Sequence, residues 1–199
     1  MVNLSFGIVA LGANLPVSAQ SLWATLGSTL GILHKHADIS ICSVSRFWKT
    51  PAFPAGSGPD YANAVALVST KLSPTALLTE LHRIEAGAGR DRTNGRWSAR
   101  VLDLDLVAYD RVILPDAAHV ESWIDLPLDQ QKIKAPDQLI LPHPRLQDRA
   151  FVLAPMAEIV PNWRHPMTSR TVAQMLADLP PDALAGIQPM PAADLPAFA

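Results

Sequence analysis

Hydrophobic and polar side chains alternate in two segments that lie far apart in the chain. Residues 1–11 (MVNLSFGIVAL) place an apolar residue at nearly every second position, and residues 100–106 (RVLDLDL) alternate leucine with aspartate. Successive side chains of a strand point to opposite faces, so both segments are predicted to be strands. In the second strand the leucines would share one face, whereas Asp103 and Asp105 would share the other.

The first strand is followed by turn residues and then by a helical pattern. Gly12, Asn14 and Pro16 predict a turn after the first strand. Ser18 is then placed to cap a helix, because leucines recur on one side at positions 22, 26, 30 and 33. We expect this helix to end before Asp38.

Two further strands and a second helix complete a recognisable order. Residues 39–50 and 61–70 predict strands, and the second of these is apolar on both faces, as in a sheet that is covered on two sides. Ser73 and Pro74 then begin a helix that is expected to end at Gly87. The order strand, helix, strand, strand, helix, strand predicts an α+β fold, a ferredoxin-like antiparallel sheet with helices on both faces in three α/β/α layers.

The patterns are weaker in the C-terminal half. Residues 111–114 and 138–141 predict short paired strands, separated by an insertion at about 115–137 that has no clean periodicity. Residues 145–160 predict one or two short helical turns that are interrupted at Pro155.

The last elements complete the expected domain organisation. Residues 171–179 predict a final helix, and the last twenty residues contain five prolines. We therefore expect a single domain over residues 1–179, followed by an extended proline-rich tail over residues 180–199.

Composition and charge narrow the possible functions. Sixteen Lys and Arg residues against 18 Asp and Glu residues give a formal charge of −2, which provides no broad basic surface for nucleic acid or an anionic membrane. The single Cys42, expected in the core, excludes an internal disulfide and a multi-cysteine zinc site. The chain begins with no basic leader and has no stretch of membrane-spanning length, so we expect a cytoplasmic protein. We also expect a monomer.

The two carboxylates of the leucine–aspartate strand have two interpretations. A half-exposed strand commonly alternates apolar and acidic residues, which would leave Asp103 and Asp105 simply in water. In a cleft, however, two ionised carboxylates about 6.6 Å apart repel each other by about 2.5 kcal/mol at an effective dielectric near 20. Cations would relieve that repulsion, and Mg²⁺ takes one or two protein carboxylates together with water and phosphate oxygens.

An arginine cluster immediately precedes these acids. Arg90, Arg92, Arg96 and Arg100 fall within eleven residues, and guanidinium groups bind phosphate oxygens bidentately. Alone, such a cluster could be a solvated charge patch. Beside paired carboxylates it points to phosphoryl transfer, although the chain has no P-loop and no dinucleotide-binding glycine motif.

Three other residues are candidates for substrate contacts. Tyr61 and Asn63 share a face at the start of a strand, where a ring and an amide could stack on and hydrogen-bond a flat heterocycle; plain packing is the alternative. His143 lies between two prolines that stiffen the backbone and could orient the ring, and a structural hydrogen bond is its alternative role.

Taken together, several segments resemble the hydroxymethyl-dihydropterin pyrophosphokinase family, whose members transfer pyrophosphate from ATP to a pterin alcohol in folate biosynthesis. The ordered set is far more specific than any one of its members. The matching segments are LGANL (11–15), KTPAF (49–53), DYANAVALVST (60–70), LSPTALLTELHRIEAGAGRDR (72–92), RWSARVLDLDLVAYD (96–110) and LPHPRLQDRAFVLAPMAEIVP (141–161).

The resemblance implies a role for each matching residue. Asp103 and Asp105 would ligate two Mg²⁺ ions, and Asp105 would belong to the catalytic set together with Arg90, Arg92 and Arg100. ATP would be the co-substrate, contacted by Glu85, Trp97, His143 and Arg149. The pterin pocket would be formed by Thr50, Pro51, Phe53, Tyr61, Asn63 and Phe151, with Tyr61 and Phe151 sandwiching the ring.

Three other functions are compatible with part of these features. A different two-metal nucleotidyl or phosphoryl transferase would use the acids and arginines but not the aromatic and amide set. A ferredoxin-like nucleic-acid-binding module would need a basic surface, and a non-catalytic pterin or nucleotide binder would be expected to lack one of the acids. The general base is also open, because the alcohol proton could pass to Asp105, to a metal-bound water or to phosphate.

Overall fold

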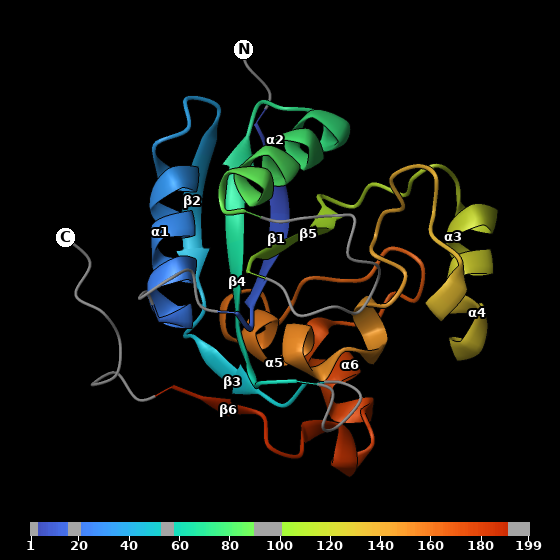
Figure 1. The fold of residues 1–199 in the computed structure, drawn as a ribbon. Coiled ribbons are helices and arrows are strands. Elements are labelled where there is room, and N and C mark those ends of the chain that lie inside the picture. The colour runs from blue at the N-terminus through green and yellow to red at the C-terminus, as the bar shows by residue number, and fades with distance from the viewer. Residues whose placement is uncertain (1–3, 16–20, 53–57, 90–100, 191–199) are drawn as a thin grey trace.

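The computed structural model describes residues 4–15, 21–52, 58–89 and 101–190. Its centre is a six-stranded antiparallel sheet in which β5, β1, β4, β3 and β6 follow one another, while β2 also pairs with β4 (Figure 1). The strands are β1 (Ser5–Ala13), β2 (Ile39–Val44), β3 (Trp48–Thr50), β4 (Tyr61–Thr70), β5 (Asp103–Tyr109) and β6 (Gln188–Pro189).

The strand order confirms the predicted ferredoxin-like arrangement. One difference concerns residues 39–50, which were expected to form one strand and instead form β2 and β3. The side chain of Ser45, between the two strands, accepts a hydrogen bond from the backbone N–H of Val65 at 2.9 Å. A side chain therefore satisfies a donor of β4 at the point where the ladder of strand pairs is interrupted.

Helices α1 (Leu22–His34) and α2 (Pro74–Gly87) cover one face of the sheet. Their leucines pack with the odd-numbered residues of β1 and with the even-numbered leucines of β5 in the larger core. The side chain of Ser73 caps α2 as predicted. The cap of α1 was placed wrongly, because Ser21 rather than Ser18 accepts the backbone N–H of Ala24.

Helices α5 (Ala150–Ile159) and α6 (Val172–Asp178) cover the opposite face (Figure 1). The predicted interruption at Pro155 is wrong, since α5 continues through the proline as one helix of ten residues. A proline inside a helix removes a backbone hydrogen bond and costs about 3 kcal/mol. Burial of Val152, Leu153 and Met156 in the second core offsets this cost, which local sequence reasoning could not include. The last helix was predicted correctly, and it begins with a capping box at Thr171.

The insertion has more structure than its sequence pattern indicated. It contains α3 (Ala117–Ile124), which is capped by Asp116, and the short α4 (Leu128–Ile133). Both lie to the side of the sheet beyond β5 (Figure 1). Leu114 and Leu141 form an isolated bridge at the base of the insertion, where the two short strands were expected.

The C-terminal segment also differs from the expected tail. After a 3₁₀ turn (Pro181–Leu184), β6 pairs with β3, and Met190 packs against the larger core. Residues up to 190 therefore pack on the sheet, and Pro189 suits this edge because it offers no N–H for further pairing.

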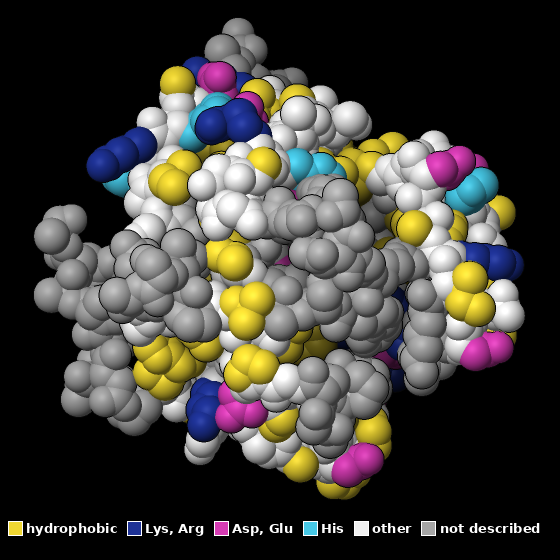
Figure 2. Space-filling model, in the orientation of Figure 1, with side chains coloured by type: hydrophobic (Ala, Val, Ile, Leu, Met, Phe, Trp, Pro, Cys, Tyr) yellow, Lys and Arg dark blue, Asp and Glu magenta, His cyan; other side chains and the backbone are white. Residues whose placement is uncertain are grey.

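The surface of the described residues carries charges of both signs. Lys, Arg, Asp and Glu side chains are interspersed on the face shown in Figure 2. Cys42, which was expected in the core, is exposed instead, because it shares the exposed face of β2 with Ser40, opposite to the face of the buried Ile39. Among the described helices, none is both long enough and apolar enough to cross a membrane.

Candidate active site

The two faces of β5 separate as the alternation predicted. Leu102, Leu104 and Leu106 are buried in the core beneath α1 and α2. Asp103 and Asp105 are half-buried on the opposite face, which is the side of α5. The leucines fix the register of β5, so the same strand that fills the core also sets the direction of both carboxylates.

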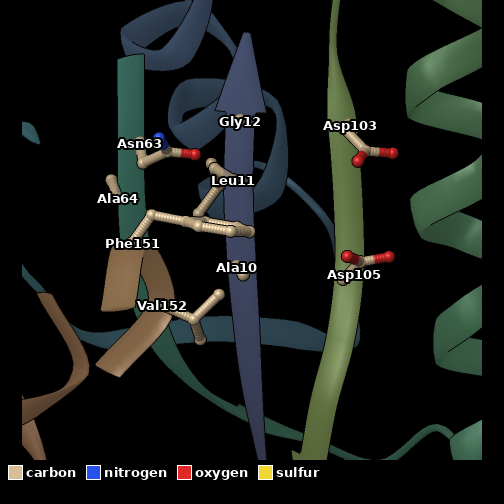
Figure 3. A pocket seen from close by; sticks show the side chains of 9 residues that line it. All are labelled: Ala10, Leu11, Gly12, Asn63, Ala64, Asp103, Asp105, Phe151 and Val152. Atoms are coloured by element: carbon tan, nitrogen blue, oxygen red, sulfur yellow. The ribbon is translucent and has the colours of Figure 1, made fainter. Parts of the chain in front are cut away.

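Both aspartates line a pocket at the end of β1, where α5 begins (Figure 3). Asn63 of β4 lies on one side of β1, the two aspartates lie on the other, and the ring of Phe151 crosses between them. The pocket is shallow and opens to solvent, and the space in it that can hold water-sized molecules amounts to about 30 Å³. It is lined by Ala10, Leu11, Gly12, Asn63, Ala64, Asp103, Asp105, Phe151 and Val152.

Arg149 connects the acidic wall to the aromatic wall. Its Nη1 lies 3.4 Å from Oδ2 of Asp105, and its guanidinium stands 5.6 Å from the centre of the Phe151 ring. Arg149 also precedes the first turn of α5, whose positive dipole end therefore lies at the pocket. The guanidinium of Arg149, the ring of Phe151 and the N-terminal end of α5 therefore all lie beside the carboxylates.

His143 belongs to the same neighbourhood, because the charges of both Asp103 and Arg149 act on its ring. Desolvation by burial, assisted by Arg149, lowers the pKa of His143 well below 6.5. Its Nδ1 accepts the backbone N–H of Arg145 at 3.0 Å. The ring is therefore neutral near pH 7, with Nδ1 used as an acceptor and the proton carried by Nε2.

Glu85 lies behind the acidic strand rather than among the residues that line the pocket. It is fully buried, and its Oε1 accepts the backbone N–H of Leu104 at 2.8 Å. This bond ties α2 to β5 between the two aspartates. The contact positions the acidic strand, and the nucleotide contact implied by the resemblance stays a prediction.

The residues expected around a pterin ring are connected by the sheet. The Asn63 side-chain amide donates to Oγ1 of Thr50 at 2.6 Å, and Thr50 is the cross-strand partner of Tyr61. This bond fixes the amide, leaving its Oδ1 on the side of Gly12. Pro51 follows directly and is exposed.

Five residues with predicted roles lie outside the described part of the chain. They are Phe53 from the pterin set and Arg90, Arg92, Trp97 and Arg100 from the nucleotide and catalytic sets.

The donor set of the pocket suits a hard divalent cation. Within the described residues, no group of three or more His, Cys, Asp and Glu side chains could enclose a metal by itself. Mg²⁺ does not need such a group, since it is held by one or two carboxylates and keeps water or phosphate oxygens at its other positions. Two half-buried carboxylates on one face fit that requirement.

Gly12 was assigned to a turn from the sequence but lies inside β1, at the floor of this pocket. A glycine after an apolar run suggests a turn because it permits unusual backbone angles. Here the glycine instead pairs with Asn63 of β4 on one side and with Asp103 of β5 on the other.

The fold and site define an α+β protein with an acidic and an aromatic wall around one pocket, and a solved structure shares this fold. The crystal structure of wild-type HPPK-DHPS from Plasmodium falciparum aligns with a TM-score of 0.62 at 12% identity, over 88% of this chain and 44% of that chain. The chain thus spans less than half of that structure, and at this identity the likeness concerns the fold alone.

The sequence comparisons show the family. Residues 8–161 match the 7,8-dihydro-6-hydroxymethylpterin-pyrophosphokinase (HPPK) family, to which this chain belongs. A 2-amino-4-hydroxy-6-hydroxymethyldihydropteridine pyrophosphokinase of Haemophilus influenzae is 34% identical over 151 residues, covering 76% of this chain and 79% of the relative. The relative of the same name from Pseudomonas aeruginosa is 31% identical over 185 residues, covering 93% and 96%.

Proposed function

We propose that this protein transfers pyrophosphate from ATP to the hydroxymethyl group of 6-hydroxymethyl-7,8-dihydropterin, a step of folate biosynthesis. The hydroxyl oxygen of the pterin bonds to the β-phosphorus, the bond from that phosphorus to the α–β bridging oxygen breaks, AMP leaves, and the hydroxyl proton is released. The observation that carries this proposal is the pocket in which Asn63 lies on one side of β1, the two carboxylates lie on the other, and the Phe151 ring crosses between them.

The acidic wall is the proposed site for Mg²⁺. Asp103 and Asp105 would hold two ions through carboxylate oxygens. When bound, Mg²⁺ supplies charge compensation for the phosphates of ATP. Without a cation, the same carboxylates would repel a triphosphate, so this wall makes nucleotide binding conditional on the metal.

The arginines and the neutral His143 beside this wall would have different roles. Asp105 holds the guanidinium of Arg149 at 3.4 Å, which keeps an arginine fork at the edge of the pocket, where it would bind phosphate oxygens. His143 would donate a hydrogen bond from Nε2 as a neutral ring. Arg90, Arg92 and Arg100 are proposed to stabilise the transferring group, and Trp97 and Glu85 are proposed for the nucleotide side.

The opposite wall is the proposed pterin site. Phe151 and Tyr61 would enclose the flat ring, and Asn63 would hydrogen-bond its edge with an amide already fixed by Thr50. Pro51 and Phe53 would complete this wall. Holding the ring here and the phosphates over β5 brings the two reacting groups together, which lowers the entropic part of the barrier.

We further propose that the protein acts as a cytoplasmic monomer that binds neither nucleic acid nor membrane. The interspersed charges of the visible face and the formal charge of −2 support this proposal. Light scattering at the concentration used for kinetics measures the oligomeric state.

The reaction itself is tested by product analysis. The protein is incubated with ATP, Mg²⁺ and hydroxymethyl-dihydropterin, and nucleotides are separated by chromatography. Pyrophosphate transfer releases AMP in amounts equal to the pterin diphosphate formed. Release of ADP would instead indicate transfer of a single phosphoryl group and would overturn the proposal.

A further inference from the structure

Gly12 lies directly between the two walls of the pocket. In the register of the sheet it pairs with Asn63 of β4 on one side and with Asp103 of β5 on the other. Neighbouring strands are about 4.8 Å apart, so the outer two residues of this row are separated by roughly 10 Å. Within this row, only a hydrogen atom stands above the strand that divides the proposed ring site from the proposed phosphate site (Figure 3).

The backbone of Gly12 does not itself demand a glycine. The glycines with positive φ among the described residues are Gly89 and Gly186, so the conformation of Gly12 suits other residues. Glycine in the interior of a strand is less favourable than alanine, because a glycine has more backbone conformations in the unfolded chain and loses more conformational entropy on folding. A reason for keeping one here must therefore come from the space above it, and strand glycines often mark the close approach of a ligand.

That space is narrow. A Cβ atom built on Gly12 would stand 3.1 Å from Oδ1 of Asn63 and 4.0 Å from Cβ of Asp103. An added methyl group would thus fill the gap between the amide and the acidic wall. Oδ1 cannot easily move away, because the amide nitrogen of the same group is bonded to Thr50.

We propose that Gly12 is a specificity-determining residue, whose missing side chain leaves the passage through which the hydroxymethyl arm of the acceptor reaches the phosphate. This inference rests on the proposed function. The ring would bind on the side of Asn63, the β-phosphorus would lie over β5, and the arm would cross above Gly12. Reacting atoms must approach to about 3–3.5 Å, which a methyl group in this passage prevents.

The test compares Gly12→Ala with the unchanged protein in two measurements. Turnover is followed as AMP release at saturating ATP and Mg²⁺, and we expect kcat to fall at least about 30-fold, because a misplacement near 1 Å can cost about 100-fold. Binding of 7,8-dihydropterin, which lacks the arm, is measured by calorimetry with Mg²⁺ and a non-hydrolysable ATP analogue. Its affinity should change less than about threefold, because the 3.1 Å contact displaces Oδ1 of Asn63 by only a few tenths of an ångström, whereas the arm would have to cross the position of the new methyl group.

Ala66→Gly is the matched control, since it exchanges the same two residue types in β4 at a core position away from the pocket. It should lower the melting temperature without lowering kcat. Turnover by Gly12→Ala within threefold of the unchanged protein overturns the proposal. So does an equal loss of turnover and of dihydropterin binding, which would mean that the methyl group merely displaces Asn63. Absence of AMP release by the unchanged protein would instead refute the proposed function.

Discussion

Neutralising Asp105 should abolish turnover while leaving the metal-free protein as stable as before or more stable. The repulsion between Asp103 and Asp105 is worth about 0.6 kcal/mol at the dielectric of water and about 2.5 kcal/mol near a dielectric of 20. Opposing this, Asp105→Asn weakens the ion pair with Arg149. The two side chains of that pair are 39% and 30% exposed, so it contributes only about 0.2–1 kcal/mol.

In EDTA, Asp105→Asn should therefore raise the free energy of unfolding by about 0–2 kcal/mol, which corresponds to a rise of at most a few degrees in melting temperature for a chain of this size. The gain should shrink with added NaCl, which screens exposed charges, and with Mg²⁺, which stabilises only the unchanged site. Thermal melts in EDTA, NaCl and Mg²⁺ measure this, with Asp137→Asn on the exposed insertion as control. A clear loss of stability in EDTA that is insensitive to salt would refute the reasoning, as would near-normal AMP release by Asp105→Asn.

Three further predictions concern other parts of the molecule. Burial lowers the pKa of His165 from 6.5 to about 4, so the native state disfavours the charged ring. The free energy of unfolding should therefore keep its full value above pH 6.5 and fall by about 3 kcal/mol as the pH is lowered towards 4. Denaturant unfolding between pH 7 and 4 measures this fall, and His165→Asn should flatten it. Arg149→Lys keeps the charge but not the planar fork, so the KM for ATP should rise about tenfold in saturation kinetics. Gly186→Ala should cost about 2 kcal/mol in unfolding experiments and raise the KM for the pterin, because Gly186 has a φ of +75° and an added Cβ would stand 2.8 Å from Cγ of Pro51.

The placement of the two carboxylates on one face of β5 was predictable because its signal is local. Alternation of period two around Asp103 and Asp105 fixes which side chains share a face, and burial of the neighbouring leucines then fixes which face is the core. The cap at Ser73 was found for the same reason, since a cap and its helix are adjacent in sequence.

The elements that were missed depend on contacts between distant segments. The continuity of α5 through Pro155 requires the second core, and the docking of β6 requires the free edge of β3. Gly12 was assigned to a turn because a glycine permits many conformations, and only the register with β4 and β5 places it between the two walls.

Calorimetric titration of ATP, with and without Mg²⁺, tests the central claim most directly. If Asp103 and Asp105 form a metal-dependent wall of the nucleotide site, ATP should bind in Mg²⁺ and lose at least about tenfold in affinity in EDTA, because the triphosphate then faces two uncompensated carboxylates. Equal affinity in the two buffers would contradict the account.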